Sequence, residues 1–181
     1  MARTWLSIRV ELVSGHATEL WPRPGRIFAA SRAHSFAQLA KAIDCAFGRW
    51  DFAHLHLFTR ADGSHVSPLQ WWHGEAPEDT ADGNTTRLST LKAGEQFAYV
   101  FDMGDDWAHL CTVAEKRIDP LDELGTTPRQ PVPYWGWGSL PDQYGRRWDG
   151  DDGESPPPEQ PAPGLSDLPP ILPWWGTPQG T

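Results

Sequence analysis

The run SFAQLAKAIDCAFGRWDFAHLHLFT, residues 35–59, carries the signal of a helix followed by that of a strand. Ser35 and Gln38 have the spacing of a capping box, in which the hydroxyl accepts from a free backbone N–H and the amide reaches back. Apolar residues then recur at helical spacing, and Gly48 stands where helices often end in a left-handed residue. They are Phe36, Leu39, Ile43, Ala46 and Phe47. We predict a helix from Ser35 to Gly48 and a strand over residues 54–59.

Alternating residues ahead of this run predict two more strands. In WLSIRVELV, residues 5–13, every second residue from Leu6 to Leu12 is apolar, which is the pattern of a half-buried strand. RIFAA, residues 26–30, is a short second strand that follows a turn rich in Pro and Gly.

The region after the helix contains a predicted hairpin. EQFAYVFD, residues 95–102, and WAHLCTVAEKRI, residues 107–118, are two strong strands. Gly104-Asp105 suits a tight turn with Gly at its first central position. Residues 65–67 form a weaker strand, and the polar residues 73–86 are expected to be a surface loop.

This order of elements predicts an α+β fold, a β-grasp-like mixed sheet packed on one main helix. We assign residues 1–154 to this domain, including an irregular Trp-rich region from about residue 134. Residues 155–173 contain eight Pro and are expected to be extended and largely polyproline II. We assign residues 155–181 as a Pro-rich, disordered tail.

Composition limits the functions that are open to the chain. The net charge is −9, and the 15 Lys and Arg residues are scattered, which disfavours non-specific binding to nucleic acid or an anionic membrane. No stretch approaches the ~20 apolar residues of a membrane helix, and no secretory leader is evident. Cys45 and Cys111 stand alone and are expected to be buried thiols. These features favour a cytoplasmic protein.

One polar constellation lies in FDMGDDWAH, residues 101–109. A turn with an even number of residues would set Asp102 opposite Trp107, and strand alternation would put Asp102, Trp107 and His109 on one face. Asp105 and Asp106 would lie at the tip. The set is suited to a divalent cation or to acid–base chemistry. The alternative is that the Asp residues cap the turn while Trp107 and His109 fill the core.

A second constellation is the pair His54 and His56. Their spacing on a strand would aim both rings at one face, as in a half-site for zinc, which needs three or four ligands. With His109 and Asp102 they would form a zinc site. The alternative is one buried and one surface histidine.

The 11 Trp residues suggest contact surfaces, because Trp dominates binding hot spots. Trp135 and Trp137 either contact a partner or fold back over the sheet. Trp174-Trp175, after the Pro-rich run, is suited to anchor a protein partner. DGDDGE, residues 149–154, lacks the spacing of a calcium loop, and no nucleotide-binding loop or nucleophile elbow is present.

Two blocks, residues 34–59 and 91–113, resemble the Ri-plasmid ORF-three-like family, whose members are also known as insertion-element passenger proteins of the TnpR type. The family pattern combines a helix that ends in Phe-Gly, a strand of the form HLHxF and a hairpin block. The hairpin block matches at Gly94, Phe97, Tyr99, Asp102, Gly104, Asp105, Trp107 and His109. The resemblance implies a link to plasmids and mobile elements.

One departure from the family concerns the segment after the hairpin. Many members carry a Cys- and Pro-rich segment there, whereas this chain has GWGSLPDQYGRRWDGDDGE, residues 136–154, without Cys. A metal role of those cysteines therefore does not transfer. The name also implies no recombinase activity, since the chain shows no basic helix-turn-helix.

These observations favour a mobile-element-associated accessory protein that binds a protein partner and has no enzymatic activity. The alternative is a metal-dependent hydrolase that uses His54, His56, Asp102, Asp106 and His109.

Overall fold

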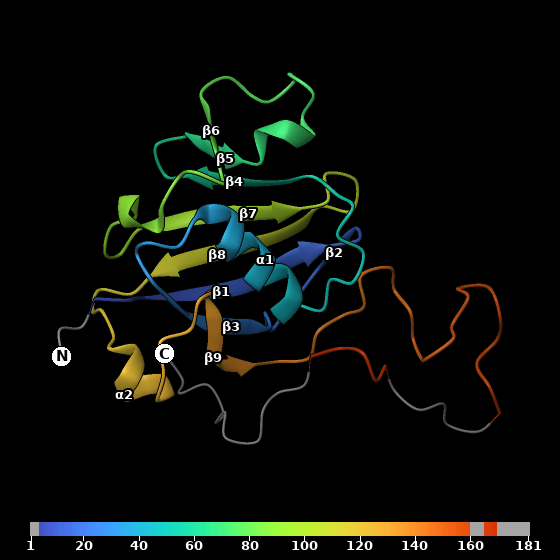
Figure 1. The fold of residues 1–181 in the computed structure, drawn as a ribbon. Coiled ribbons are helices and arrows are strands. Elements are labelled where there is room, and N and C mark those ends of the chain that lie inside the picture. The colour runs from blue at the N-terminus through green and yellow to red at the C-terminus, as the bar shows by residue number, and fades with distance from the viewer. Residues whose placement is uncertain (1–3, 160–164, 170–181) are drawn as a thin grey trace.

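A computed structural model describes residues 4–159 and 165–169 (Figure 1). Within these residues, nine strands form one sheet. The strands are β1 (Leu6–Gly15), β2 (Thr18–Glu19), β3 (Gly25–Ala30), β4 (His56–Arg60), β5 (His65–Ser67), β6 (Thr80–Asp82), β7 (Gln96–Phe101), β8 (Trp107–Val113) and β9 (Val132–Trp137). The helices are α1 (Phe36–Ala46), the short α2 (Pro120–Leu124) and two single 3₁₀ turns, η1 (Leu69–Trp71) and η2 (Leu88–Thr90).

The strand order is β6-β5-β4-β7-β8-β1-β3-β9, and β2 pairs with the end of β1. Every pair is antiparallel except β5 with β6, so the sheet is mixed. This confirms the α+β class with one main helix. The narrower β-grasp assignment stays a prediction.

Helix α1 begins and ends as its sequence predicts. The backbone N–H of Gln38 donates to Ser35 Oγ at 3.2 Å, and the Ser35 N–H donates to Gln38 Oε1 at 2.8 Å, which completes the capping box. After the helix, Gly48 adopts a left-handed φ of 76°. The capping motif and the terminal glycine therefore fix both ends of α1.

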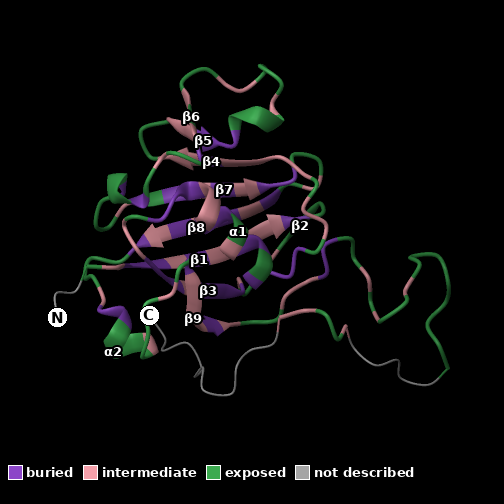
Figure 2. Cartoon of the chain, in the orientation of Figure 1, coloured by how far each residue is buried: buried purple, intermediate pink, exposed green. Residues whose placement is uncertain are grey.

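The core lies between α1 and the face of the sheet that it crosses (Figures 1 and 2). Leu39 and Ile43 are fully buried on the helix. On β1, the predicted alternation is confirmed, because Ile8, Val10 and Leu12 are also fully buried. The aromatic residues of β4, β7 and β8 complete this core.

Several element boundaries differ from the expectations. Strand β4 begins at His56 rather than at residue 54, and β8 ends at Val113 rather than near residue 118. The expected surface loop contains β6, which pairs with β5.

The Trp-rich region is only partly irregular. Residues Val132–Trp137 form β9, which pairs with the open edge of β3 and so satisfies backbone groups there. Trp135 and Trp137 are half-buried on this strand.

The described part of the tail, residues 155–159 and 165–169, has no helix or strand. Trp174 and Trp175 lie outside the described residues. The extent of disorder stays a prediction. None of the described helices is long and apolar enough to cross a bilayer.

Candidate functional site

The connection between β7 and β8 differs from the predicted turn. Phe101, not Asp102, pairs with Trp107, because the connection Asp102–Asp106 has an odd number of residues. The residues with a left-handed backbone are Asp102, at φ 62°, and Asp106, at φ 55°. The predicted turn had placed Gly104 in this conformation. The expectation that Asp102 lies opposite Trp107 is therefore wrong.

The Asp102 side chain caps this loop and contacts a neighbouring segment. Its Oδ1 accepts backbone N–H groups of Gly104 at 2.9 Å and Asp105 at 3.3 Å. Its Oδ2 lies 3.2 Å from His54 Nδ1. Asp102 thus joins the hairpin to the loop between α1 and β4.

His109 lies away from this contact, in the core. It is 2% exposed, its Nδ1 lies 3.1 Å from the carbonyl oxygen of Tyr99, and its ring packs edge-on against Phe47. Burial, helped by the nearby Arg49 cation, lowers the pKa of His109 to about 3. The expected face shared by Asp102, Trp107 and His109 is not formed by strand pairing, because Phe101 pairs with Trp107 and Asp102 lies beyond the end of β7.

His56 also belongs to the core side. Its ring packs near Tyr99 and Phe58, and burial lowers its pKa to about 4. His54 precedes β4, so strand alternation does not relate the two histidines. In the described part of the chain, no three His, Cys, Asp or Glu side chains form a group that could hold a metal ion. The zinc site stays a prediction.

A polar network does form around His54, with residues that the sequence reasoning missed. His54 Nε2 lies 2.9 Å from the hydroxyl oxygen of Tyr144 and 3.4 Å from Asp51 Oδ2. The Tyr144 hydroxyl donates to Asp51 Oδ2 at 2.8 Å. Desolvation, followed by this bond to Asp51, raises the pKa of Tyr144 to about 12. Each ring nitrogen of His54 therefore faces an oxygen of a neighbouring side chain.

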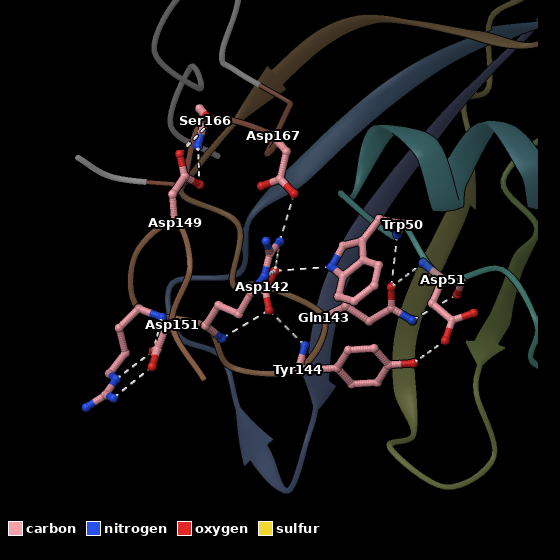
Figure 3. Close-up of polar contacts among 11 residues, drawn as sticks. Trp50, Asp51, Asp142, Gln143, Tyr144, Asp149, Asp151, Ser166 and Asp167 are labelled. Atoms are coloured by element: carbon pink, nitrogen blue, oxygen red, sulfur yellow. Dashed lines mark hydrogen bonds and ion pairs between the residues drawn. The ribbon is translucent and has the colours of Figure 1, made fainter. Parts of the chain in front are cut away.

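Residues 142–144 clamp the loop after α1 (Figure 3). Gln143 is fully buried, and its Oε1 accepts the backbone N–H groups of Trp50 at 2.9 Å and Asp51 at 3.0 Å. Its Nε2 donates to the Asp51 carbonyl at 3.0 Å. One glutamine thus holds both backbone donors and an acceptor of this loop.

Asp142 fixes the clamp itself. Its Oδ2 accepts the backbone N–H groups of Tyr144 and Arg146, each at 3.0 Å, and its Oδ1 accepts from Arg146 Nε at 2.9 Å. Trp50 Nε1 also donates to Oδ1, at 3.3 Å. Burial alone would raise the pKa of Asp142, but the Arg146 bonds hold it below its ordinary value.

The clamp presents the aromatic pair Trp50 and Tyr144 at the surface. We call this pair, together with Asp51, His54 and Asp102, the aromatic–acidic site. Trp50 is 48% exposed and Tyr144 38%, and their rings meet edge-on at 5.1 Å. A hollow of about 260 Å³ lies beside them, lined also by Arg146 and residues 151–153. The guanidinium of Arg146 lies 5.1 Å from the Trp50 ring centre.

A buried cation lies beneath the site. Arg49 is 3% exposed and stacks 3.7 Å above the Trp107 ring, and burial lowers its pKa to about 10. Asp44, Asp105 and Asp142 surround it and favour its charge. This layer links the aromatic–acidic site to the core.

The Trp137 side chain is held by contacts within its own chain. Its Nε1 donates to the Arg23 carbonyl at 2.9 Å, Arg9 stacks 4.5 Å from its ring centre, and the ring fills the space beside Gly25. It folds back over the sheet, as one of the two sequence interpretations holds.

Together these features define a small α+β protein with one mixed sheet, one covering helix and an aromatic–acidic surface site built from three distant segments. The chain belongs to the plasmid pRiA4b ORF-3-like family, whose model matches residues 5–130. Trp50, Asp51, His54 and Asp102 lie inside the matched range, and residues 142–146 lie outside it.

Comparison with solved structures finds a protein of unknown function from Methanosarcina mazei Go1, MM3350. The TM-score is 0.47 at 17% sequence identity, over 71% of this chain and 61% of that chain. The match therefore spans less than two thirds of that protein. No curated protein matches.

The sequence contains a weak signal for the missed residues. Trp50-Asp51 follows the helix-ending Gly48 and precedes His54, so a polar group and an exposed aromatic stand together in GRWDFAH, residues 48–54. Nothing in the local pattern connects this run with DQY, residues 142–144, some 90 positions away.

Proposed function

We propose that this protein is a non-enzymatic binding protein that recognises a basic segment of a protein partner at the aromatic–acidic site. The observation that carries the proposal is a half-exposed Trp50–Tyr144 pair held rigidly beside carboxylates. Aromatic faces and carboxylates are the groups that receive Lys and Arg side chains.

The local charge supports a cationic partner. Arg146, which lines the hollow, is already bound by Asp142, and the next residue, Arg147, is bound by Asp151. Asp51, Asp102 and Asp105 add negative charge nearby. The whole chain carries −9, so it would attract a basic partner over a distance.

The existing contact of Arg146 shows how a cation fits this site. Its guanidinium is fixed by Asp142 while it faces the ring of Trp50. An incoming Arg or Lys would use the same combination of ring and carboxylate at the exposed parts of Trp50 and Tyr144. Both nitrogens of His54 are occupied by neighbours, which supports a binding role over proton transfer.

The test is peptide binding by calorimetry. A twelve-residue peptide rich in Lys and Arg should bind, and the same peptide with Glu in those positions should not. Trp50→Ala should weaken binding by about 30-fold, the effect of a hot spot worth about 2 kcal/mol. Trp71→Ala is the matched control, because Trp71 is 44% exposed but lies in η1. Equal losses in both variants would contradict the site.

The setting of this function is also part of the proposal. The family name refers to a plasmid reading frame, which supports association with mobile elements and a passenger role. Cys111 is buried as expected, whereas the expectation of a buried Cys45 is wrong, because Cys45 is exposed on α1. Both are free thiols, which supports a reducing, cytoplasmic location.

A metal-dependent hydrolase is the second candidate, and the 3.2 Å contact between His54 and Asp102 is the observation in its favour. Elemental analysis of untagged protein tests it. One zinc per chain, lost together with a hydrolytic activity in His54→Ala, would favour this candidate over the binding protein.

A further inference from the structure

A basic hollow lies at the end of the sheet away from the aromatic–acidic site. Its volume is about 400 Å³, and it lies where β8 ends and β1 begins (Figure 1). The β7–β8 hairpin, which carries Asp102, is at the opposite end of these strands. The basic hollow is therefore separate from the site that we propose for a basic partner.

Three cationic side chains from three segments line the basic hollow. Arg32 stands in the turn before α1, Lys92 between η2 and β7, and Arg117 after β8. Among the described residues that line it, none is an Asp or a Glu. A chain with a net charge of −9 thus gathers three positive charges around one concave site, where they attract an anion.

Neighbouring carboxylates do not neutralise this charge. Within residues 4–159 and 165–169, none of the three cations forms an ion pair, whereas Arg60 pairs with Glu95 at 2.7 Å. Glu95 lies near Lys92 but is held by both Nε and Nη2 of Arg60. The carboxylate of Glu115 lies against Gly94 and offsets at most one of the three charges. The basic hollow therefore keeps a net positive charge.

Arg32 carries a buried donor without an acceptor. Its Nη2 donates to the Ser89 carbonyl oxygen at 3.4 Å, which is a long bond. Its Nε is buried and has no hydrogen-bond partner in the described part of the chain. Because buried N–H groups are almost always bonded in proteins, this donor indicates an acceptor that comes from outside the chain.

The backbone that carries the cations is held by hydrogen bonds. The Lys92 N–H donates to Glu95 Oε2 at 2.9 Å. Next to Arg117, Trp5 and Ile118 exchange two backbone hydrogen bonds, at 3.1 and 3.0 Å. A ligand would therefore order side chains but little backbone, which lowers the entropic cost of binding.

The remaining wall and the volume indicate the chemistry of the ligand. Leu6, Leu91 and Val113 form a buried apolar floor, so an anionic group with an apolar body fits best. A phosphate monoester carries nearly two negative charges at neutral pH, and its three terminal oxygens can accept from several cationic donors at once. A volume of about 400 Å³ is typical of pockets for small molecules.

We infer that the basic hollow binds a small phosphate monoester. The phosphate lies among Arg32, Lys92 and Arg117, and the apolar body packs against Leu91 and Val113. This inference goes beyond the recognition of a basic partner, because it uses the opposite end of the sheet and the opposite charge.

The test is a calorimetric titration of the full chain with phenyl phosphate at about pH 7.5, where the phosphate is mainly dianionic. We expect saturable binding with a Kd on the order of 0.1–1 mM. Inorganic phosphate, which lacks the apolar body, should bind about tenfold more weakly, and phenol, which lacks the charge, should not bind. The absence of saturable binding up to about 10 mM phenyl phosphate would overturn the inference.

Two neighbouring basic residues give a matched pair of variants. Arg117→Gln should weaken phenyl phosphate binding about tenfold, because it removes a cation of the basic hollow. Lys116→Gln removes the same charge from an exposed residue outside the hollow and should change the Kd less than about twofold. Equal losses in the two variants would reveal general charge attraction and overturn the site.

Two further measurements complete the design. Arg32→Gln should weaken binding at least as much as Arg117→Gln, with circular dichroism as the check on folding. Arg117→Gln should bind the Lys- and Arg-rich peptide as the unaltered chain does, so each of the two sites can fail without the other. A short single-stranded oligonucleotide that binds more tightly than phenyl phosphate would also overturn the inference, because it would assign the hollow to a nucleic-acid backbone.

Discussion

At the residue scale, Gln143 connects the two halves of the aromatic–acidic site. It is fully buried and contacts the backbone of both Trp50 and Asp51. A side chain that satisfies three backbone groups at once positions a loop more firmly than surface packing does, because each buried group left unpaired is costly.

Gln143→Ala should therefore lower the free energy of unfolding by about 1–3 kcal/mol and weaken peptide binding at the same time. Urea unfolding and calorimetry measure the two effects. Gln130→Ala, at an exposed glutamine, should change neither. A stable variant with intact binding would show that the clamp does not position Trp50.

The buried His109 predicts a pH dependence. Its pKa falls to about 3 in the folded protein, while an unfolded histidine titrates near about 6.5. As the pH falls from about 6.5 towards about 3, His109 is protonated in the unfolded chain but stays neutral in the folded chain. The free energy of unfolding therefore decreases over this pH range.

His109→Gln should reduce the loss of unfolding free energy at acid pH, because the Gln amide can still donate to the Tyr99 carbonyl but does not titrate. Urea midpoints at several pH values measure it. Asp44, whose pKa burial raises to about 7, works in the opposite direction in both proteins and cancels in the difference. Parallel curves for the two proteins would contradict a neutral, buried His109.

The sequence predicted correctly which residues share a face of the sheet only where the strand register could also be predicted. The alternation of β1 was correct because one strand suffices to define it. Asp102 was misplaced because its face depends on whether the hairpin loop is odd or even, and the loop is closed by left-handed Asp102 and Asp106 rather than by glycine. The alternative interpretation of the aspartates as turn caps is correct for Asp102.

At the element scale, α1 is the piece that local sequence specifies best. Its capping box, its apolar stripe and Gly48 all point to one helix, and all three are found. β6 and β9 were not predicted, because their strands are defined by distant partners, β5 and β3, and not by a periodic pattern of their own.

Leu39→Ala tests the helix packing. Leu39 is fully buried against the sheet, so the variant should lose about 2–5 kcal/mol of unfolding free energy through the cavity it leaves. Leu121→Ala is the matched control, since Leu121 in α2 is 39% exposed and should lose about 0.5 kcal/mol or less. Denaturant unfolding measures the loss of unfolding free energy in each variant. Similar losses in the two variants would mean that α1 does not hold the core.

At the scale of the whole molecule, the aromatic–acidic site joins three segments that are far apart in sequence. The α1–β4 loop, the β7–β8 hairpin and residues 142–144 meet through Gln143, His54 and Asp102. Their encounter depends on the order of strands in the sheet, so sequence patterns alone did not reveal it. The acidic balance of the chain was evident from composition, and it agrees with the basic partner that we propose.

The most direct measurement of that partner preference is a titration followed by the indole N–H resonances of ¹⁵N-labelled protein, with Trp50→Phe and Trp71→Phe used for assignment. A Lys- and Arg-rich peptide should shift the Trp50 signal, whose N–H donates to Asp142, and leave the Trp71 signal in place. The shift should shrink as salt rises from about 0.1 M to about 1 M, because screening shortens from about 10 Å to about 3 Å. An unmoved Trp50 signal, or an equal response to the Glu-substituted peptide, would contradict the account.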